Sequence, residues 1–248
     1  MESHTEPMNP VILIPARMES TRFPGKPLAP IKGEPMVIRC AKNAIKTGIR
    51  TLVCTDSEMI KLVCEDYKIE VIETPRFNTG TDRIAWAAAN LGNDIVINLQ
   101  GDEPLVNTEA ISKFASHIAS EFLSTDIIWN GVTSIEQKSA FDPNNVKAVV
   151  DGAGRILYLT RKPIRNSIES ELFPIYLKQL GLYGFTKEIL MEFASITNSR
   201  LEKSESVEML RWLENGKKLM SINLQCTSVS VDTPEDIVEV ERIINESI

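Results

Sequence analysis

Positive charge gathers in a proline-rich segment that follows the first apolar run of the chain. Arg17, Arg22 and Lys26 fall within ten residues there. Such cations suit a triphosphate, whose charge must be neutralised as pyrophosphate leaves. The segment lacks the GxGxxG pattern of a dinucleotide-binding fold, and because Pro27 follows Lys26 it is not a P-loop either. The spacing therefore favours phosphate binding over the alternative, a surface loop with solvated charges.

Two aspartates follow apolar runs and could hold a metal ion. Asp102 lies in the motif Gln100-Gly-Asp-Glu-Pro104, and Asp232 lies in Val231-Asp-Thr-Pro-Glu-Asp236. Mg²⁺ binds one or two protein carboxylates together with phosphate oxygens and water. Each motif also has a plainer interpretation, because Gly-Asp-Glu-Pro forms turns and Asp232 can assist helix capping. Together with the cationic segment, the two aspartates predict a metal–nucleotide site and nucleotidyl transfer.

The histidines give little support to a mechanism that needs an imidazole base. His4 lies in the polar N-terminal segment, and His117 falls within a predicted helix beside apolar residues. A Ser-His-Asp or Cys-His nucleophile needs a histidine with a defined partner, and the sequence offers none at either position. We therefore expect charge neutralisation and positioning to carry the chemistry.

The first half of the chain alternates short apolar runs with helical patterns. Predicted strands are 11–14, 51–54, 69–72 and 94–99, and predicted helices are 36–47, from Ser57 onward, 81–91 and 108–122. This repeated alternation predicts a Rossmann-like α/β fold with a doubly wound, mostly parallel sheet. Ligands of such sheets bind at the carboxyl ends of the strands, which is where the segment with Arg17 and the motif with Asp102 begin.

The second half of the chain has a different pattern, which predicts a late antiparallel extension. Predicted strands 146–150 and 155–160 flank Asp151-Gly-Ala-Gly154, which indicates a hairpin. The other predicted elements are strands at 180–185, 219–224 and 228–231, a helix at 204–214 and a final helix from Pro234. We expect one domain over residues 10–248 behind a polar tail at 1–9, with the extension at about 145–205.

Composition is that of a globular protein and excludes several classes of partner. The 248 residues are 43% hydrophobic and 25% charged, and 27 basic against 34 acidic residues give a net charge of −7. This acidity disfavours nucleic acid and anionic membranes as partners, and no apolar run approaches the roughly 20 residues of a membrane helix. The N-terminus lacks the pattern of a secretory signal. We expect a cytoplasmic enzyme with reduced thiols, because no CxxC spacing joins Cys40, Cys54, Cys64 and Cys226.

Six motifs, in chain order, resemble those of one enzyme family. They are Ile14-Pro-Ala-Arg17, Ser20-Thr-Arg22, Pro24-Gly-Lys-Pro-Leu28, Gly80-Thr-Asp-Arg83, Gln100-Gly-Asp-Glu-Pro104 and Val231-Asp-Thr-Pro-Glu-Asp236. From about Pro10 to its end, the chain resembles the 3-deoxy-manno-octulosonate (Kdo) cytidylyltransferases, the CMP-Kdo synthetases of lipopolysaccharide assembly. The resemblance implies a nucleotide-diphospho-sugar transferase fold. It also implies attack of the sugar's anomeric hydroxyl on the α-phosphate of CTP, which gives CMP-Kdo and pyrophosphate.

The resemblance further implies roles for individual residues. The implied nucleotide contacts are Pro15, Ala16, Arg17, Lys26, Thr79, Gly80 and Thr81. The implied Mg²⁺ ligands are Asp102 and Asp232, which with Arg17 and Lys26 form the implied catalytic set. The residues implied to face the acidic 3-deoxy-ulosonate are Gln100, Arg161, Gln179, Tyr183 and Glu208. Arg161 could bind the sugar carboxylate through two parallel hydrogen bonds. The resemblance also implies a homodimer built through the extension.

Two positions on the implied sugar side depart from the family pattern. Gln179 stands where the family usually has histidine, and Met209 stands where it usually has glutamine. Gln179 cannot become cationic and Met209 has no amide, so both bear on the identity of the sugar. The alternatives to Kdo are a modified ulosonate such as 8-amino-3,8-dideoxy-manno-octulosonate, and a nine-carbon acid such as neuraminate or a non-sugar alcohol. A third alternative is a regulator that binds CTP without turnover.

Overall fold

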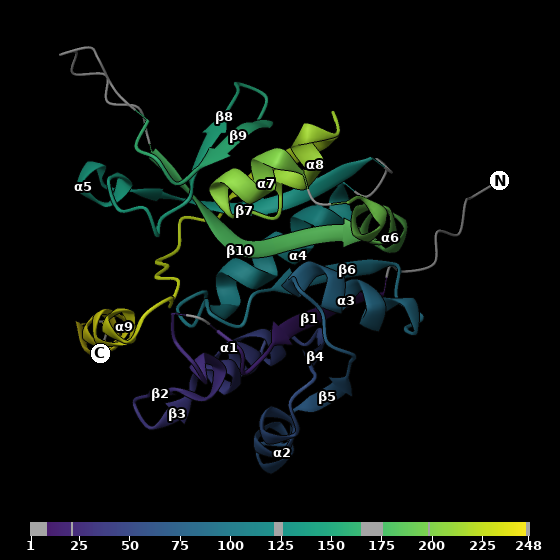
Figure 1. Cartoon of the computed structure of the whole chain (residues 1–248), viewed down its shortest axis with the longest axis vertical. Helices are drawn as coiled ribbons and strands as arrows, with labels where there is room; N and C mark the ends of the chain where they lie inside the picture. Colours follow the sequence, from purple (N-terminus) through teal and green to yellow (C-terminus); the bar gives the residue numbers. More distant parts are fainter. Residues whose placement is uncertain (1–8, 21, 122–125, 165–175, 198, 247–248) are drawn as a thin grey trace.

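The computed structural model describes residues 9–20, 22–121, 126–164, 176–197 and 199–246, which are organised around a central sheet (Figure 1). The main path of the sheet runs β11-β7-β10-β6-β1-β4-β5. These strands are β1 (Pro10–Ala16), β4 (Arg50–Thr55), β5 (Glu70–Glu73), β6 (Ile95–Leu99), β7 (Ile127–Ile135), β10 (Tyr176–Thr186) and β11 (Lys218–Asn223), and a separate small ladder joins β2 (Pro30–Ile31) to β3 (Glu34–Pro35). Strand β10 is antiparallel to β6 and β7, whereas the other neighbours on this path are parallel. The prediction of a mostly parallel α/β sheet is therefore confirmed.

Helices cover both faces of this sheet. The helices of the described residues are α1 (Met36–Ile45), α2 (Glu58–Asp66), α3 (Gly80–Ala89), α4 (Thr108–Ser120), α5 (Gln137–Ala140), α6 (Lys187–Ser195), α7 (Arg200–Glu205), α8 (Leu210–Glu214) and α9 (Pro234–Glu246), with a short 3₁₀ turn, η1, at Lys26–Leu28. Ile12 and Ile14 of β1 join the core that α1, α2 and α4 cover. Val11 and Leu13 join the core that α3, α6 and α8 cover. Successive side chains of a strand point to opposite faces, so a strand buried on both faces is apolar at every position.

Local capping signals mark the starts of three helices and the end of one in the first half of the chain. The side chains of Ser57, Thr79 and Asn107 accept hydrogen bonds from main-chain amides at the starts of α2, α3 and α4. Gly48 follows α1 with a φ of 79°, which glycine adopts without strain. The strand–helix alternation predicted for this half is confirmed. Because β1 and β6 are parallel neighbours, the segments that follow them emerge at the same edge of the sheet.

The second half adds the antiparallel part of the sheet. Strands β8 (Lys147–Val150) and β9 (Ile156–Thr160) form the predicted hairpin, and β8 also pairs with β10. The register between β10 and β7 shifts between Gln179 and Tyr183. The sequence patterns had not indicated β7 or α6. The extension is therefore part of the main sheet, because β10 pairs with β6 and β7 and also with β8.

Two predictions for the second half are wrong. The predicted helix 204–214 is two helices, α7 and α8, because Ser206 adopts a left-handed conformation with a φ of 54°. Such a residue cannot continue a right-handed helix. Residues 228–231 form no strand. Hydrogen bonds from their side chains and main chain hold them instead, as described below.

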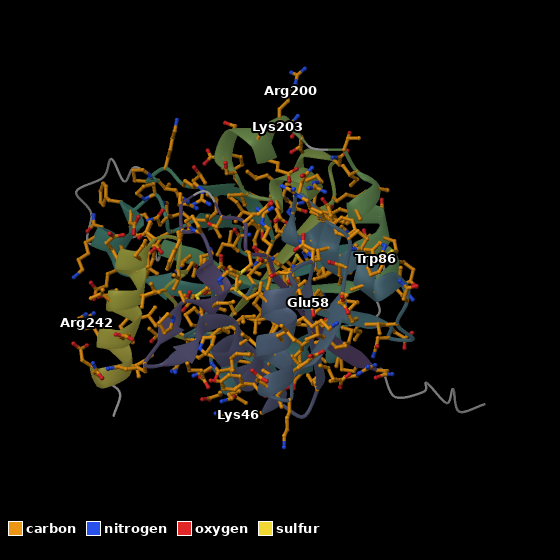
Figure 2. All side chains as sticks on the ribbon, turned by 60° about the horizontal axis from the view of Figure 1, so that its bottom comes forward. Lys46, Glu58, Trp86, Arg200, Lys203 and Arg242 are labelled. Atoms are coloured by element: carbon orange, nitrogen blue, oxygen red, sulfur yellow. The ribbon has the colours of Figure 1, made fainter. Side chains whose placement is uncertain are left out.

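Many charged side chains lie at the periphery of the molecule. Figure 2 shows Lys46, Arg200, Lys203 and Arg242 projecting outward. Within the described residues, no helix is both long and apolar enough to cross a membrane. The four cysteines are unpaired, as their spacing predicted. No disulfide between them therefore contributes to the stability of the fold.

Candidate active site

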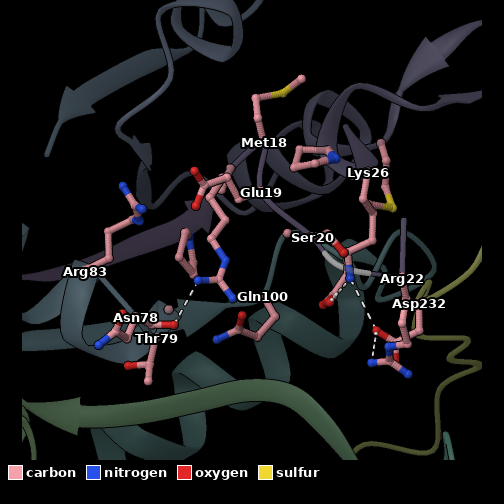
Figure 3. Close-up of a pocket in the computed structure, with 18 of the residues that line it drawn as sticks. Met18, Glu19, Ser20, Arg22, Lys26, Asn78, Thr79, Arg83, Gln100 and Asp232 are labelled. Atoms are coloured by element: carbon pink, nitrogen blue, oxygen red, sulfur yellow. Dashed lines mark hydrogen bonds and ion pairs between the residues drawn. The ribbon is translucent and has the colours of Figure 1, made fainter. Parts of the chain in front are cut away.

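A cavity of about 810 Å³ opens where β1 and β6 end and α3 begins. In Figure 3, Lys26 and Asp232 lie on one side of it and Thr79 and Arg83 on the other, with Gln100 between them. The predicted site residues in its lining are Pro15, Ala16, Arg17, Lys26, Thr79, Gly80, Gln100, Asp102, Glu208 and Asp232. The fold therefore gathers most of the residues implied to bind nucleotide and metal into one cavity.

Lys26 lies between the two predicted metal ligands. Its Nζ is 2.7 Å from Asp102 Oδ2 and 3.4 Å from Asp232 Oδ1, and it donates to the Val231 carbonyl at 2.8 Å. Arg22 also reaches Asp232, at 3.0 Å. The Val231 amide donates to the Asp102 carbonyl at 2.9 Å, which holds the two acidic motifs side by side. Burial alone lowers the pKa of Lys26, but the two carboxylates outweigh it and raise that pKa, so the ammonium stays charged.

Glu103 holds residues 228–231 against the turn that carries Asp102. Its side chain is only 2% exposed. Oε1 accepts hydrogen bonds from the Gly181 amide at 2.9 Å and the Ser230 hydroxyl at 2.7 Å, and Oε2 accepts one from the Ser228 hydroxyl at 2.7 Å. A buried carboxylate needs such donors to offset the loss of hydration. Hydrogen bonds from Ser228 and Ser230 therefore hold this segment in place, although it forms no β-ladder.

A buried lysine on β10 completes this network. Lys178 is 2% exposed, and its Nζ donates to both the carbonyl and the hydroxyl of Ser228 at 3.2 Å. The Ser228 hydroxyl thus links the ammonium of Lys178 to the carboxylate of Glu103. This link places opposite charges near each other in the interior, where an isolated charge would be costly.

Arg17 and the start of α3 approach each other in the larger cavity. The Nη1 of Arg17 donates to the carbonyl of Asn78 at 2.9 Å. Thr79, which caps α3, and Gly80 line this cavity, so the positive end of the helix dipole lies beside it and favours negative charge there. Gly80 lies so close to Gln100 that a Cβ at Gly80 would come within 3.1 Å of the Gln100 Oε1. The arrangement offers donors to an anion and leaves little room beside the glutamine.

A smaller cavity of about 170 Å³ adjoins the larger one. The residues that line both are Arg22, Gln100, Asp102, Ser206, Glu208 and Asp232. The smaller cavity also contains the predicted sugar-side residues Arg161, Gln179 and Tyr183. Asp102 and Asp232 therefore lie at the junction, where a group bound in one cavity meets a group bound in the other.

Arg161 is held by main-chain oxygens. Its Nε donates to the Glu205 carbonyl at 2.9 Å, its Nη1 to the Pro143 carbonyl at 3.0 Å and its Nη2 to the Ser206 carbonyl at 3.4 Å. A guanidinium has five N–H groups, so each terminal nitrogen retains one for another acceptor. Such a fixed guanidinium is preorganised for a planar anion such as a carboxylate.

Thr81 does not line either cavity, in contrast to its implied contact with nucleotide. Its side chain is fully buried, and its hydroxyl and its amide both donate to Glu208 Oε2, the amide at 3.2 Å. Burial raises the pKa of Glu208 above its ordinary value, although the two hydrogen bonds from Thr81 act in the opposite direction. Thr81 therefore positions Glu208, which faces both cavities.

Gln179 and Met209, the two departures from the family pattern, have different surroundings. Gln179 lines the smaller cavity, and its Nε2 donates to Asn130 Oδ1 at 2.8 Å. Asn130 in turn donates to the carbonyls of Leu180 and Leu182. Met209 is fully buried in the core with α3 and α6 and lines neither cavity. The expectation that Met209 lies on the sugar side is therefore wrong, because this residue precedes α8, which packs against that core.

Tyr183 presents a neutral hydroxyl-bearing side chain to the smaller cavity. Burial raises the pKa of Tyr183 well above its ordinary value, and the negative charges of Glu208, Glu103 and Asp102 raise it further. The phenol therefore keeps its proton throughout the neutral range and can donate a hydrogen bond to a ligand.

Sequence reasoning gave no role to several residues of the site. Arg83 lines the larger cavity and pairs with Asp56 at 3.0 Å, although it is almost completely buried. Arg83 ends the Gly-Thr-Asp-Arg motif, and Glu103 directly follows Asp102. Both positions could have marked these residues as part of the site. Lys178 and Ser228 had no such signal, because their partners lie far away along the chain.

Asp102 and Asp232 fit a divalent cation that arrives with a nucleotide. In the part of the chain that the structure describes, no group of three or more histidine, cysteine, aspartate or glutamate side chains could hold a metal by itself. The two aspartates reach one common point, since both contact the same nitrogen of Lys26. Mg²⁺ is commonly bound in this way, by one or two carboxylates with the remaining positions taken by phosphate and water.

Comparison with known proteins agrees with this geometry. A family model described as cytidylyltransferase matches residues 11–219. A 3-deoxy-manno-octulosonate cytidylyltransferase of Chlorobium phaeobacteroides (strain BS1) is 39% identical, with 97% of this chain and 99% of that protein aligned. An 8-amino-3,8-dideoxy-manno-octulosonate cytidylyltransferase of Shewanella halifaxensis (strain HAW-EB4) is 41% identical, with 93% and 96% aligned.

Solved structures show the same relationship. A CMP:2-keto-3-deoxy-manno-octonic acid synthetase complexed with CTP superposes with a TM-score of 0.87 at 29% identity, covering 96% of this chain and 99% of that one. HddC from Yersinia pseudotuberculosis, at 14% identity and a TM-score of 0.69, shares the fold, with coverage of 94% and 99%. This chain therefore belongs to the cytidylyltransferase family, and it is an enzyme of the CMP-Kdo synthetase type.

Proposed function

We propose that this protein activates Kdo with CTP and Mg²⁺, giving CMP-Kdo and pyrophosphate for lipopolysaccharide biosynthesis. The observation that carries the proposal is the position of Asp102 and Asp232 at the junction of two cavities. The larger cavity, with its cations and the start of α3, suits a nucleoside triphosphate. The smaller one, with Arg161, suits an acidic sugar. The names of the relatives support the same pair of substrates.

Positive charge in the larger cavity would neutralise the triphosphate. Arg17, Arg22 and Lys26 all line this cavity. Charge accumulates on pyrophosphate as it leaves, and cations that line its binding site stabilise that charge. Mg²⁺ bound by Asp102 and Asp232 would supply polarisation of the α-phosphate. The contribution of the chain itself is charge neutralisation and positioning.

The smaller cavity would orient the sugar. Arg161 would bind its carboxylate, while Tyr183 and Gln100 offer neutral hydrogen-bonding groups. The anomeric hydroxyl would then face the α-phosphorus at the junction, where its oxygen bonds to phosphorus and the bond to pyrophosphate breaks. Among the described residues no histidine lines either cavity, so charged surroundings and not an imidazole base would favour loss of the hydroxyl proton.

A second candidate substrate is the 8-amino analogue of Kdo. Gln179 lies in the smaller cavity and carries no charge, so it does not repel an ammonium group as a protonated histidine would. The relative from Shewanella halifaxensis, which is named for that sugar, supports the same alternative. A CTP-binding regulator without turnover is the remaining alternative and predicts binding of CTP with no release of pyrophosphate.

The proposal includes a homodimer that assembles through the extension. It also includes a cytoplasmic location. Leu157 on β9 is 48% exposed, so a charged residue at this position can test an interface formed by the hairpin. The unpaired cysteines are consistent with a reducing compartment. Sedimentation of the purified chain, with Leu157→Lys as the comparison, would test the dimer. A monomer in both cases would exclude it.

The experiment that tests the function is pyrophosphate release from CTP with Mg²⁺ and, in parallel, Kdo, 8-amino-Kdo and neuraminate. Highest kcat/KM with Kdo supports the proposal, and highest kcat/KM with 8-amino-Kdo supports the second candidate. Turnover only of neuraminate would overturn both. Release from no sugar, with normal CTP binding, would favour the regulator. Asp232→Asn serves as the control, because it should abolish any release that depends on the site.

A further inference from the structure

Lys26 occupies the position between Asp102 and Asp232 that a divalent cation held by both carboxylates would need. Its Nζ lies 2.7 Å and 3.4 Å from the two carboxylates and 2.8 Å from the Val231 carbonyl. These acceptors can engage all three N–H donors of one ammonium. The side chain is only 15% exposed, so water contributes little to this contact. A metal ion bound to both carboxylates cannot share the same space.

A metal ion and this ammonium would also repel each other. Like charges at contact distance in a partly buried site interact far more strongly than in bulk water. Lys26 must therefore leave the carboxylates when a divalent cation binds them. The same residue lines the larger cavity, and its flexible stem allows the ammonium to reach a phosphate placed there.

We propose that Lys26 is the exchangeable counter-ion of the two aspartates and that its transfer to the nucleotide makes Mg²⁺ and CTP bind cooperatively. This inference rests on the proposed function, because CTP supplies the phosphates that receive the ammonium. Metal alone must displace Lys26 with no new partner for its charge. Metal together with CTP gives the ammonium a phosphate partner. By linkage, each ligand then strengthens the binding of the other by the same factor.

The neighbouring cation does not replace Lys26 in this role. Arg22 contacts Asp232 at 3.0 Å, but its side chain is 52% exposed, and water screens exposed charges. Removing the ammonium of Lys26 leaves Asp102 without the partner that it has at 2.7 Å. Two adjacent carboxylates would then attract a divalent cation more strongly. The inference therefore predicts opposite effects of one substitution, namely tighter metal binding and weaker nucleotide binding.

The test measures binding of Mn²⁺ alone to the full chain, from the spectrum of the free ion in electron paramagnetic resonance. Without nucleotide, Lys26→Met should bind Mn²⁺ about tenfold more tightly than the wild type, within the range usual for coupled sites. Its affinity for CTP should fall by a similar factor. Lys42→Met is the matched control, because Lys42 pairs with Glu34 and does not line the cavity. It should leave both affinities unchanged.

Two further variants make the result specific. Asp232→Asn in the Lys26→Met background should abolish the gain in Mn²⁺ affinity, because the gain depends on both carboxylates. Lys26→Arg keeps a cation and should bind Mn²⁺ as weakly as the wild type. Mn²⁺ should also raise the melting temperature of Lys26→Met more than that of the wild type. The rise in melting temperature is measured for each protein relative to the same protein without metal. It therefore remains informative if repulsion between Asp102 and Asp232 destabilises Lys26→Met.

One result would overturn the inference. If Lys26→Met binds Mn²⁺ no more tightly than the wild type while its CTP affinity falls, Lys26 is only a phosphate ligand. Failure of the proposed function would look different, because the wild type would then release no pyrophosphate from any ulosonate. The Mn²⁺ measurement uses no sugar and no turnover, so the two failures are distinguishable.

Discussion

The guanidinium of Arg161 donates from each of its nitrogens to a carbonyl oxygen, on Glu205, Pro143 and Ser206. Glu103 is likewise surrounded by several polar partners. A charged side chain fixed in this way loses little conformational freedom when a ligand binds. At the residue scale, the site therefore depends on partners that hold charge in place, and substitutions that retain the charge but change the geometry are informative.

Arg161→Lys should raise the KM for the ulosonate by about tenfold to a hundredfold, since a lysine loses one of two charge-assisted hydrogen bonds worth about 1.5–3 kcal/mol. The KM for CTP should change little, because Arg161 lines only the smaller of the two cavities described. Arg155→Lys is the control, since Arg155 is on the same hairpin but pairs with Asp151. Steady-state kinetics with each substrate varied checks the prediction. Equal increases in both KM values would contradict a sugar-specific role.

At the element scale, β10 shapes the smaller cavity through its irregular register. The strand departs from regular pairing with β7 between Gln179 and Tyr183, and Gly181 lies within that stretch. The Gly181 carbonyl accepts a hydrogen bond from the Gln100 amide at 2.7 Å, and its amide donates to Glu103 at 2.9 Å. The glycine allows β10 and the turn that carries Asp102 to approach closely, so both surfaces of the cavity depend on it.

Gly181→Ala should lower kcat/KM at least about tenfold and destabilise the fold by about 1–3 kcal/mol, the usual cost of overpacking. A Cβ at this position would lie 2.8 Å from the Gln100 Cβ and 3.0 Å from the Glu103 Cγ. Gly152→Ala is the control, because a Cβ there meets nothing within 4 Å. Urea unfolding and turnover would be measured on both. Normal turnover by Gly181→Ala would show that the turn tolerates displacement.

At the scale of the whole molecule, a buried ion cluster joins the two halves of the chain. Arg211 on α8 is 2% exposed and donates to both carboxylate oxygens of Glu202 on α7, at 2.7 and 2.8 Å. It also pairs with Asp82 on α3 at 3.0 Å and stacks 4.7 Å from the Phe193 ring of α6. Since α3 also begins beside the larger cavity, this cluster connects the late helices to the first half of the chain.

Arg211→Met should lower the free energy of unfolding by about 3–5 kcal/mol, because it leaves buried carboxylates without their cation. Arg242→Met should cost only about 0–1 kcal/mol, since that arginine pairs with Glu239 and Glu246 on the exposed surface of α9 (Figure 2). Urea denaturation of both variants checks the difference. Similar small losses would mean that packing rather than the ion cluster holds the halves together.

Local patterns were sufficient for much of the fold. Alternation of apolar runs with capped helical segments predicted β1, β4, β5, β6 and the helices between them, because these signals act over a few neighbouring residues. The pattern did not separate α7 from α8, since Ser206 has no side-chain feature that marks a left-handed conformation. Strand-like composition at 228–231 was misleading because hydrogen bonds donated to Glu103 by the hydroxyls of Ser228 and Ser230 replace a strand partner there.

The sequence by itself determined the family, the cationic segment and the two aspartates, because these are properties of residue type and order. Only the tertiary structure decided that Lys26 lies between aspartates 76 and 206 positions away, and that Met209 faces a core instead of a cavity. It also joined Lys178 to Glu103 through Ser228. The physical reason is that such contacts depend on how β10 and the final segment pack against β6. No local pattern encodes the direction in which a side chain meets a partner so distant along the chain.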